Sequence, residues 1–184
     1  RYGMMLVGGG LRVMLATRHL PLKEVPGAIT KEVVREAVEL AYEGLAWLGV
    51  DQRSIGVCGL NPHAGDGGAL GLEEKTILNP VLRALAKKGM PVSMALPADT
   101  LFHQALRGEY EAVVAMYHDQ GLAPLKMMGF DEGINLTLGL PIVRTSPDHG
   151  TAFGLAGEGM ATAKSMREAI RLAVRLANRK NPWI

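Results

Sequence analysis

IGVCGLNPHAGDGG, residues 55–68, is the stretch that decides the fold class. Its first six residues form a short apolar run typical of a buried strand, and the remainder is a glycine-rich loop. An amphipathic helix is predicted after the loop, from about residue 72 to residue 88, and Gly89 is its natural end. The stretch therefore predicts a strand, a loop and a helix in succession, which is the repeating unit of an α/β protein.

The same unit recurs toward the C-terminus. Strands are predicted over residues 92–96, 112–117 and 133–139, with a short helix over 100–107 between the first two and a final amphipathic helix over about 161–178. A loop is expected between the last strand and the last helix, through residues 148–151.

The N-terminal part of the chain is expected to open with a hairpin. Apolar runs at residues 4–7 and 11–16 flank three glycines, which favour a tight turn between two strands. Thr30 is a plausible N-cap for the helix that follows, and Gly49 ends it. Together these elements predict an α/β fold with α/β/α layers and a mainly parallel sheet with right-handed crossovers.

The composition limits the possible functions. The 184 residues are 48% hydrophobic and 21% charged, with a net charge of +2 and basic residues interleaved with acids. This pattern gives no sign of nucleic-acid or membrane partners and is compatible with a small acidic substrate. The single cysteine, Cys58, lies in an apolar run and is expected to be a buried thiol. Without a long apolar segment or a signal-peptide pattern, we expect a cytoplasmic protein.

Three histidines and one aspartate follow predicted strands directly: His19, His63, Asp99 and His118. Ligands of α/β sheets bind at the carboxyl ends of strands, so these side chains are candidates for one site. Three neutral imidazoles suit a divalent transition metal and leave positions open for a substrate. Asp99 or Asp119 could orient a ligand histidine. The alternative is that each histidine is a separate surface residue, because their spacing matches no short metal signature.

A second group consists of Lys126, Asn135 and Arg144, in a segment interrupted by glycines. These side chains could hold a phosphate, since Arg can bind it through two hydrogen bonds, Lys supplies charge and an amide adds neutral hydrogen bonds. The alternative is a set of separate surface charges. A glycine fingerprint of the G-x-G-x-x-G kind is absent after the first strand, which argues against a standard Rossmann dinucleotide site.

Several runs of the sequence resemble the 4-hydroxythreonine-4-phosphate dehydrogenase family, in collinear order along essentially the whole chain. They are TRHLPL (17–22), GLNPHAGDGG (59–68), LPADTLF (96–102), AMYHDQGL (115–122), NLTLGLP (135–141), RTS (144–146) and DHGTA (148–152). The resemblance implies an isocitrate/isopropylmalate-dehydrogenase-like subunit and a homodimer with active sites shared at the interface.

The resemblance also assigns roles to individual residues. It implies that His19, His63 and His118, drawn from both subunits, hold a divalent metal such as Zn, Mg or Co. It implies substrate contacts from Lys126, Asn135 and Arg144, with Asp99 and Asp119 as the acids that support catalysis. The loop His149-Gly150-Thr151-Ala152 resembles the adenosine-side loop of β-decarboxylating dehydrogenases, which bind NAD, or NADP, without the glycine fingerprint.

The implied reaction is NAD-dependent oxidation and decarboxylation of 4-phosphooxy-L-threonine to 3-amino-2-oxopropyl phosphate, for pyridoxal phosphate synthesis. By the same resemblance, residues 1–140 are a metal-binding, substrate-binding and dimerisation subdomain. Residues 141–184 are then the C-terminal part of a nucleotide-binding subdomain, and the family's N-terminal portion is absent. The alternatives are a dehydrogenase of D-threonate or D-erythronate 4-phosphate and a catalytically inactive metal-binding or dimerisation fragment.

Overall fold

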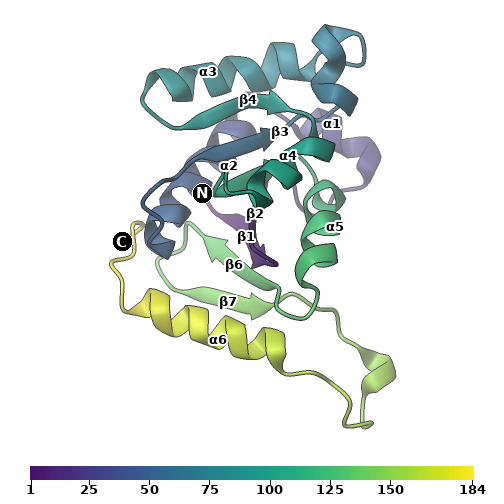
Figure 1. Cartoon of the computed structure of the whole chain (residues 1–184), viewed down its shortest axis with the longest axis vertical. Helices are drawn as coiled ribbons and strands as arrows, with labels where there is room; N and C mark the ends of the chain where they lie inside the picture. Colours follow the sequence, from purple (N-terminus) through teal and green to yellow (C-terminus); the bar gives the residue numbers. More distant parts are fainter.

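The fold is built on one seven-stranded sheet, which Figure 1 shows in a computed structural model describing residues 1–184. Its strand order is β4-β3-β5-β2-β1-β6-β7. The strands are β1 (Gly3–Gly8), β2 (Leu11–Leu15), β3 (Ile55–Cys58), β4 (Val92–Leu96), β5 (Ala112–Ala115), β6 (Ile134–Leu138) and β7 (Arg144–Pro147). Strands β2 to β6 run in one direction, whereas β1 and β7 run in the other. The predicted α/β class and mainly parallel sheet are confirmed.

The hairpin predicted at the N-terminus is β1 and β2, which pair antiparallel. Gly9 and Gly10 form its turn with φ of 58° and 81°, the left-handed backbone that a tight hairpin turn requires and that glycine adopts without steric penalty. A Cβ atom on Gly9 would also lie 2.6 Å from the side chain of Met128. This turn therefore needs glycine for both its geometry and its packing.

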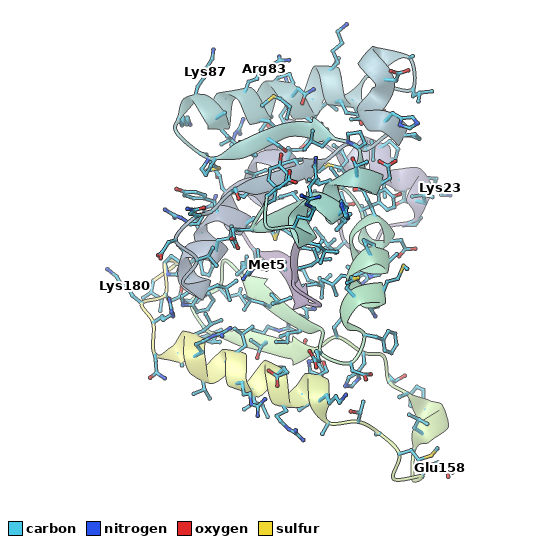
Figure 2. The ribbon with its side chains drawn as sticks, viewed as in Figure 1. Met5, Lys23, Arg83, Lys87, Glu158 and Lys180 are labelled. Atoms are coloured by element: carbon cyan, nitrogen blue, oxygen red, sulfur yellow. The ribbon has the colours of Figure 1, made fainter.

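Helices cover both faces of the sheet. The face with the larger core of 26 buried residues is covered by α2 (Lys31–Leu48), α3 (Asn79–Lys87) and α6 (Lys164–Ala177). The other face, with a core of 12 residues, is covered by α4 (Ala98–Leu106) and α5 (His118–Gly129). Met5, at the middle of the molecule in Figure 2, belongs to the larger core and is fully buried. The predicted α/β/α layers are thus present.

The local signals at α2 act as the sequence predicts. The Thr30 hydroxyl accepts a hydrogen bond from the Val33 N–H, and Gly49 ends the helix with φ of 83°. A short helix α1 (Val25–Ala28) precedes it, and α3 is preceded by a π-helical turn at Glu74–Leu78. None of the helices is long and apolar enough to span a membrane.

Helix α5 and strand β7 were not predicted, and neither was the short helix α1. Helix α5 contains Gly121 and Pro124, which obscure its helical pattern. Strand β7 is short and polar and ends in Pro147, as an edge strand can, because its outer side needs no ladder hydrogen bonds. It pairs with β6 in the same sheet, so the boundary proposed at residue 140 falls between two adjacent strands.

Candidate active site

The strand order brings the candidate residues to one edge of the sheet. Strands β4, β3, β5 and β2 are adjacent and parallel, so their carboxyl ends lie side by side. Asp99 follows β4, His63 follows β3, His118 follows β5 and His19 follows β2. All four residues therefore lie at the same edge of the sheet.

His19 and His118 are close neighbours, with ring centroids 5.1 Å apart. Thr17 holds the two strand ends together, because its backbone N–H and its hydroxyl both donate to the Met116 carbonyl, at 3.1 and 2.7 Å. The two imidazoles line a cavity of about 600 Å³ together with Arg18, Tyr117 and Asp119, among other residues. Two of the three predicted metal ligands thus converge within one chain.

Asp119 sets the chemistry available to His118. Its Oδ1 lies 2.7 Å from Nδ1 of the imidazole, which leaves the other ring nitrogen, Nε2, available to a ligand. A carboxylate on one ring nitrogen fixes the tautomer and the orientation of the ring, as in metal-bound histidines. The donor set of His19 and His118 therefore fits a divalent transition metal.

His63 lies in a separate cavity of about 350 Å³, which Asn61, Asp99, Tyr117 and Gln120 also line. Within one chain no group of three His, Cys, Asp or Glu side chains is placed to hold a metal ion. His63 is exposed at the surface, as is Asp99. The third candidate ligand is therefore presented outward from the chain rather than toward the first two.

An unusual turn presents His63. All residues from His63 to Gly68 have positive φ, including the non-glycine residues His63, Ala64 and Asp66. Non-glycine residues in this region are strained by roughly 1–2 kcal/mol each, and such strain clusters at functional sites.

The turn is held by a buried carboxylate that the sequence analysis did not single out. Glu74 is only 3% exposed, and it accepts hydrogen bonds from the N–H and the side-chain amide of Asn61. The half-exposed Glu73 also accepts from the Asn61 amide, at 2.8 Å. The pKa of Glu73 is lowered by its own backbone N–H and by the Asn61 amide. Glu74 itself begins the π-helical turn, a distortion often found at functional sites.

Gln120 was also missed, and it joins two strand ends of the site. Its amide donates to the Gly59 carbonyl at 2.8 Å and accepts from the Met116 N–H at 2.7 Å. Gly59 follows β3 and Met116 follows β5. Gln120 therefore links the strand end that leads to His63 with the strand end that leads to His118. The only available signal in the sequence was its position two residues after His118.

The three residues predicted to bind phosphate are only partly brought together. Asn135 and Arg144 line a cavity of about 340 Å³ together with Arg18. Asn135 lies on β6 and Arg144 on the adjacent strand β7. Lys126 does not line this cavity. Its Nζ lies 3.8 Å from a carboxylate oxygen of Asp148 and 5.8 Å from the Phe130 ring centroid.

The candidate nucleotide loop, His149-Gly150-Thr151-Ala152, is exposed along its whole length. It begins a segment that extends away from the sheet in Figure 1, and Figure 2 marks Glu158 at its far end. The described contacts within the loop are local: Nδ1 of His149 lies 3.0 Å from the Gly150 carbonyl, and Ala152 has φ of 49°. The role of the loop in cofactor binding stays a prediction.

Comparison with known proteins identifies the family. A profile for the pyridoxal phosphate biosynthetic protein PdxA matches residues 1–173. The chain belongs to the PdxA family. A 4-hydroxythreonine-4-phosphate dehydrogenase of Roseobacter denitrificans is 50% identical over 177 residues, which are 96% of this chain and 54% of that protein. Another, from Chromobacterium violaceum, is 54% identical over 95% of this chain and 53% of that protein.

Solved structures of PdxA relatives agree with the fold. A 4-hydroxythreonine-4-phosphate dehydrogenase from Klebsiella pneumoniae has a TM-score of 0.86 at 41% identity, over 96% of this chain and 54% of that one. A terephthalate 1,2-cis-dihydrodiol dehydrogenase from Burkholderia xenovorans has a TM-score of 0.78 at 33% identity, over 95% and 55%. The present chain thus spans about half the length of the PdxA relatives that it matches.

Proposed function

We propose that this chain forms the metal-binding and phosphate-binding half of an NAD-dependent dehydrogenase active site that acts on 4-phosphooxy-L-threonine. The main observation that supports this proposal is that the His19–His118 pair and the cavity of Asn135 and Arg144 both border Arg18. A chelating end and an anionic end of one small molecule can thus be bound side by side. The relatives named 4-hydroxythreonine-4-phosphate dehydrogenase support this choice of substrate.

A divalent metal bound there would supply Lewis-acid stabilisation of negative charge on the substrate oxygen during oxidation and decarboxylation. His19 and His118 would hold it from one chain, and Asp119, through its contact with Nδ1, would fix the orientation of the His118 ring. Asn135 and Arg144 would fix the phosphate end, so that the reacting carbon is oriented toward the nicotinamide. Lys126 would join them once it leaves Asp148, and Asp99 would support the site from the His63 side.

We propose a homodimer in which His63 of one chain completes the site of the other. Two features support it: the outward position of His63 and four exposed leucines that flank the candidate ligands. Leu20 and Leu22 follow His19 and are 41% and 69% exposed, while Leu70 and Leu72 follow the His63 turn and are 48% and 57% exposed. Large apolar side chains at the surface are candidates for a subunit interface.

The remaining parts of the proposal concern the cofactor, the subdomains and the cell compartment. His149-Gly150-Thr151-Ala152 is exposed and free to contact the adenosine side of NAD, or of NADP. Residues 141–184 would then belong to a nucleotide-binding subdomain and residues 1–140 to the metal, substrate and dimer subdomain. The cytoplasm, where pyridoxal phosphate synthesis would draw on NAD, is the proposed location.

The test is NADH formation with a divalent metal and either 4-phosphooxy-L-threonine or D-threonate 4-phosphate. It should use this chain and also a chimera in which the N-terminal portion of the Roseobacter denitrificans relative precedes residue 1. Turnover of the first ester by the chimera supports the proposal, and exclusive turnover of the second replaces the substrate. Metal binding without turnover by either protein would favour a metal-binding or dimerisation fragment.

A second candidate follows from the Burkholderia xenovorans neighbour, whose name gives a dihydrodiol substrate. The same assay with a cis-dihydrodiol of terephthalate distinguishes it. Because the three peripheral oxygens of a phosphate can engage Arg18, Arg144 and Asn135 together, whereas a carboxylate has two oxygens, we expect the phosphate ester to be preferred.

A further inference from the structure

We propose that Arg18 is a ligand-binding residue that holds the phosphate group of the substrate together with Arg144 and Asn135. This inference rests on the proposed function for the identity of the ligand, and adds a residue that neither the family resemblance nor the phosphate prediction assigned. In the present structure Arg18, and not Lys126, is the second cation that lines the phosphate cavity.

The position of Arg18 is fixed by its neighbours in the chain. Thr17 is buried and is anchored to the end of β5 by two hydrogen bonds, and His19 lies against His118. Arg18 stands between them and is half-buried. It lines the histidine cavity on one side and the cavity of Asn135 and Arg144 on the other, and is the residue that the two cavities have in common.

The charge of the phosphate cavity is unbalanced. Its lining residues are Tyr2, Gly3, Met4, Arg18, Asn135, Thr137, Leu140 and Arg144, and none of them is acidic. Neither arginine takes part in an ion pair, unlike Arg12 on β2, which pairs with Glu111 at 3.0 Å. Two uncompensated guanidinium groups facing one cavity favour an anion there.

Most hydrogen-bond donors of the two guanidinium groups are unused. Arg18 donates to the Tyr2 carbonyl at 3.3 Å and lies over the Tyr2 ring, 4.5 Å from its centroid. Arg144 donates to the Thr137 hydroxyl at 2.8 Å. Because a guanidinium carries five N–H donors, each arginine retains several for a ligand.

Asn135 supplies the third side of the cavity. Its Oδ1 is buried without a hydrogen-bond partner, and its Nδ2 contacts only the Met4 sulfur, a weak acceptor, at 3.1 Å. Because the Met4 sulfur is a weak acceptor, the N–H donors of this amide are available to a phosphate oxygen, whereas Oδ1, itself an acceptor, is not a partner for an anion. Phosphate suits this set better than carboxylate, because three peripheral oxygens can engage two guanidinium groups and an amide together.

The experiment measures binding of inorganic phosphate to the 184-residue chain by calorimetry, without added metal, with acetate as the carboxylate probe. We expect Arg18→Ala to weaken phosphate binding by about tenfold or more, as expected for a lost charge-assisted hydrogen bond. Arg18→Lys should weaken it less, since it keeps the charge and loses the two-pronged donor geometry. Arg12→Ala, on the strand that leads to Arg18, is the matched control and should leave phosphate binding unchanged.

Three results would overturn the proposal: equal binding by the wild type and Arg18→Ala, equal affinity for acetate and phosphate, or no phosphate binding by the wild type. Arg18→Lys serves as the decisive variant if Arg18→Ala fails to show the circular dichroism spectrum of the wild type. The readout is separate from turnover. Loss of phosphate binding in Arg18→Ala with no NADH formation by any variant would retain Arg18 and reject the dehydrogenase proposal. NADH formation together with unchanged phosphate binding in Arg18→Ala would reject the role of Arg18 and leave the dehydrogenase proposal standing.

Discussion

The carboxylate of Glu74 binds Asn61 twice, with Oε1 2.7 Å from the backbone nitrogen and Oε2 3.0 Å from the side-chain nitrogen. Because Asn61 precedes the left-handed turn that carries His63, this pair determines where the turn begins. Gly65 lies against the same carboxylate, and a Cβ atom there would be 2.6 Å from Oε2. The turn, the glycine and the buried acid therefore depend on one another.

Replacing Glu74 should destabilise the protein far more than replacing its neighbour. We expect Glu74→Ala to lower the free energy of unfolding by about 2–3 kcal/mol, because two partly buried donors of Asn61 lose the buried carboxylate that accepts from them. Glu73→Ala, the matched control, removes a half-exposed carboxylate and should change it by about 0.5 kcal/mol. Urea denaturation measures both. Equal effects of the two substitutions would contradict the role given to Glu74.

The strain in the turn predicts opposite effects at adjacent positions. Ala64→Gly should stabilise the protein by up to about 1 kcal/mol, because Ala64 has φ of 52° and glycine removes the steric penalty. Gly65→Ala should destabilise it by more than about 2 kcal/mol, through its φ of 82° and the contact with Glu74. Thermal unfolding of both variants checks the pair. Destabilisation by Ala64→Gly would argue against a left-handed turn.

The shared metal site predicts complementation between two inactive variants. Neither His63→Ala nor His118→Ala should retain the divalent metal. A refolded equal mixture should regain about one quarter of the wild-type metal, because half of the dimers are mixed and each has one intact site. Metal analysis after gel filtration measures it. No recovery in a mixture that forms dimers would mean that His63 and His118 do not meet across the subunits.

The buried thiol predicts a pH-dependent response. Burial raises the pKa of Cys58, so the folded protein keeps this group neutral at alkaline pH, at which the unfolded chain ionises it. The stability that the neutral thiol contributes is therefore complete below the pKa of Cys58 in the unfolded chain. It is lost as the pH rises through that value toward the higher pKa of the folded protein. A thiol reagent at neutral pH should label Cys58 only after denaturant is added. Rapid labelling of the native protein would contradict its burial.

The sequence predicted the fold where local signals and packing agree. The glycine turn at residues 8–10 and the Thr30 cap of α2 depend on neighbouring residues alone, and both are as expected. Helix α5 could not be recognised, because Pro124 and the glycines of this segment are more typical of a loop. The helix forms because it packs against the sheet, and this contact is not visible in the local sequence.

The candidate site shows the same division. The shared edge of His19 and His118 follows from strand alternation, but strand order decides which ends are adjacent, and β5 lies between β3 and β2. Glu74 and Gln120 could not be identified, because a buried acid and a bridging amide acquire their roles only from residues distant in the sequence. Arg18 stands beside a predicted ligand, yet its significance depends on the two cavities that meet at it.

The amide of Gln120 gives the two halves of the site a mechanical connection. A displacement of His118 on ligand binding would be passed through this side chain to the strand end that leads to His63. In a dimer where His63 serves the neighbouring subunit, that displacement reaches the second site as well. Cooperative binding between the two sites of the assembly, weakened in a Gln120→Ala variant, is the consequence to look for.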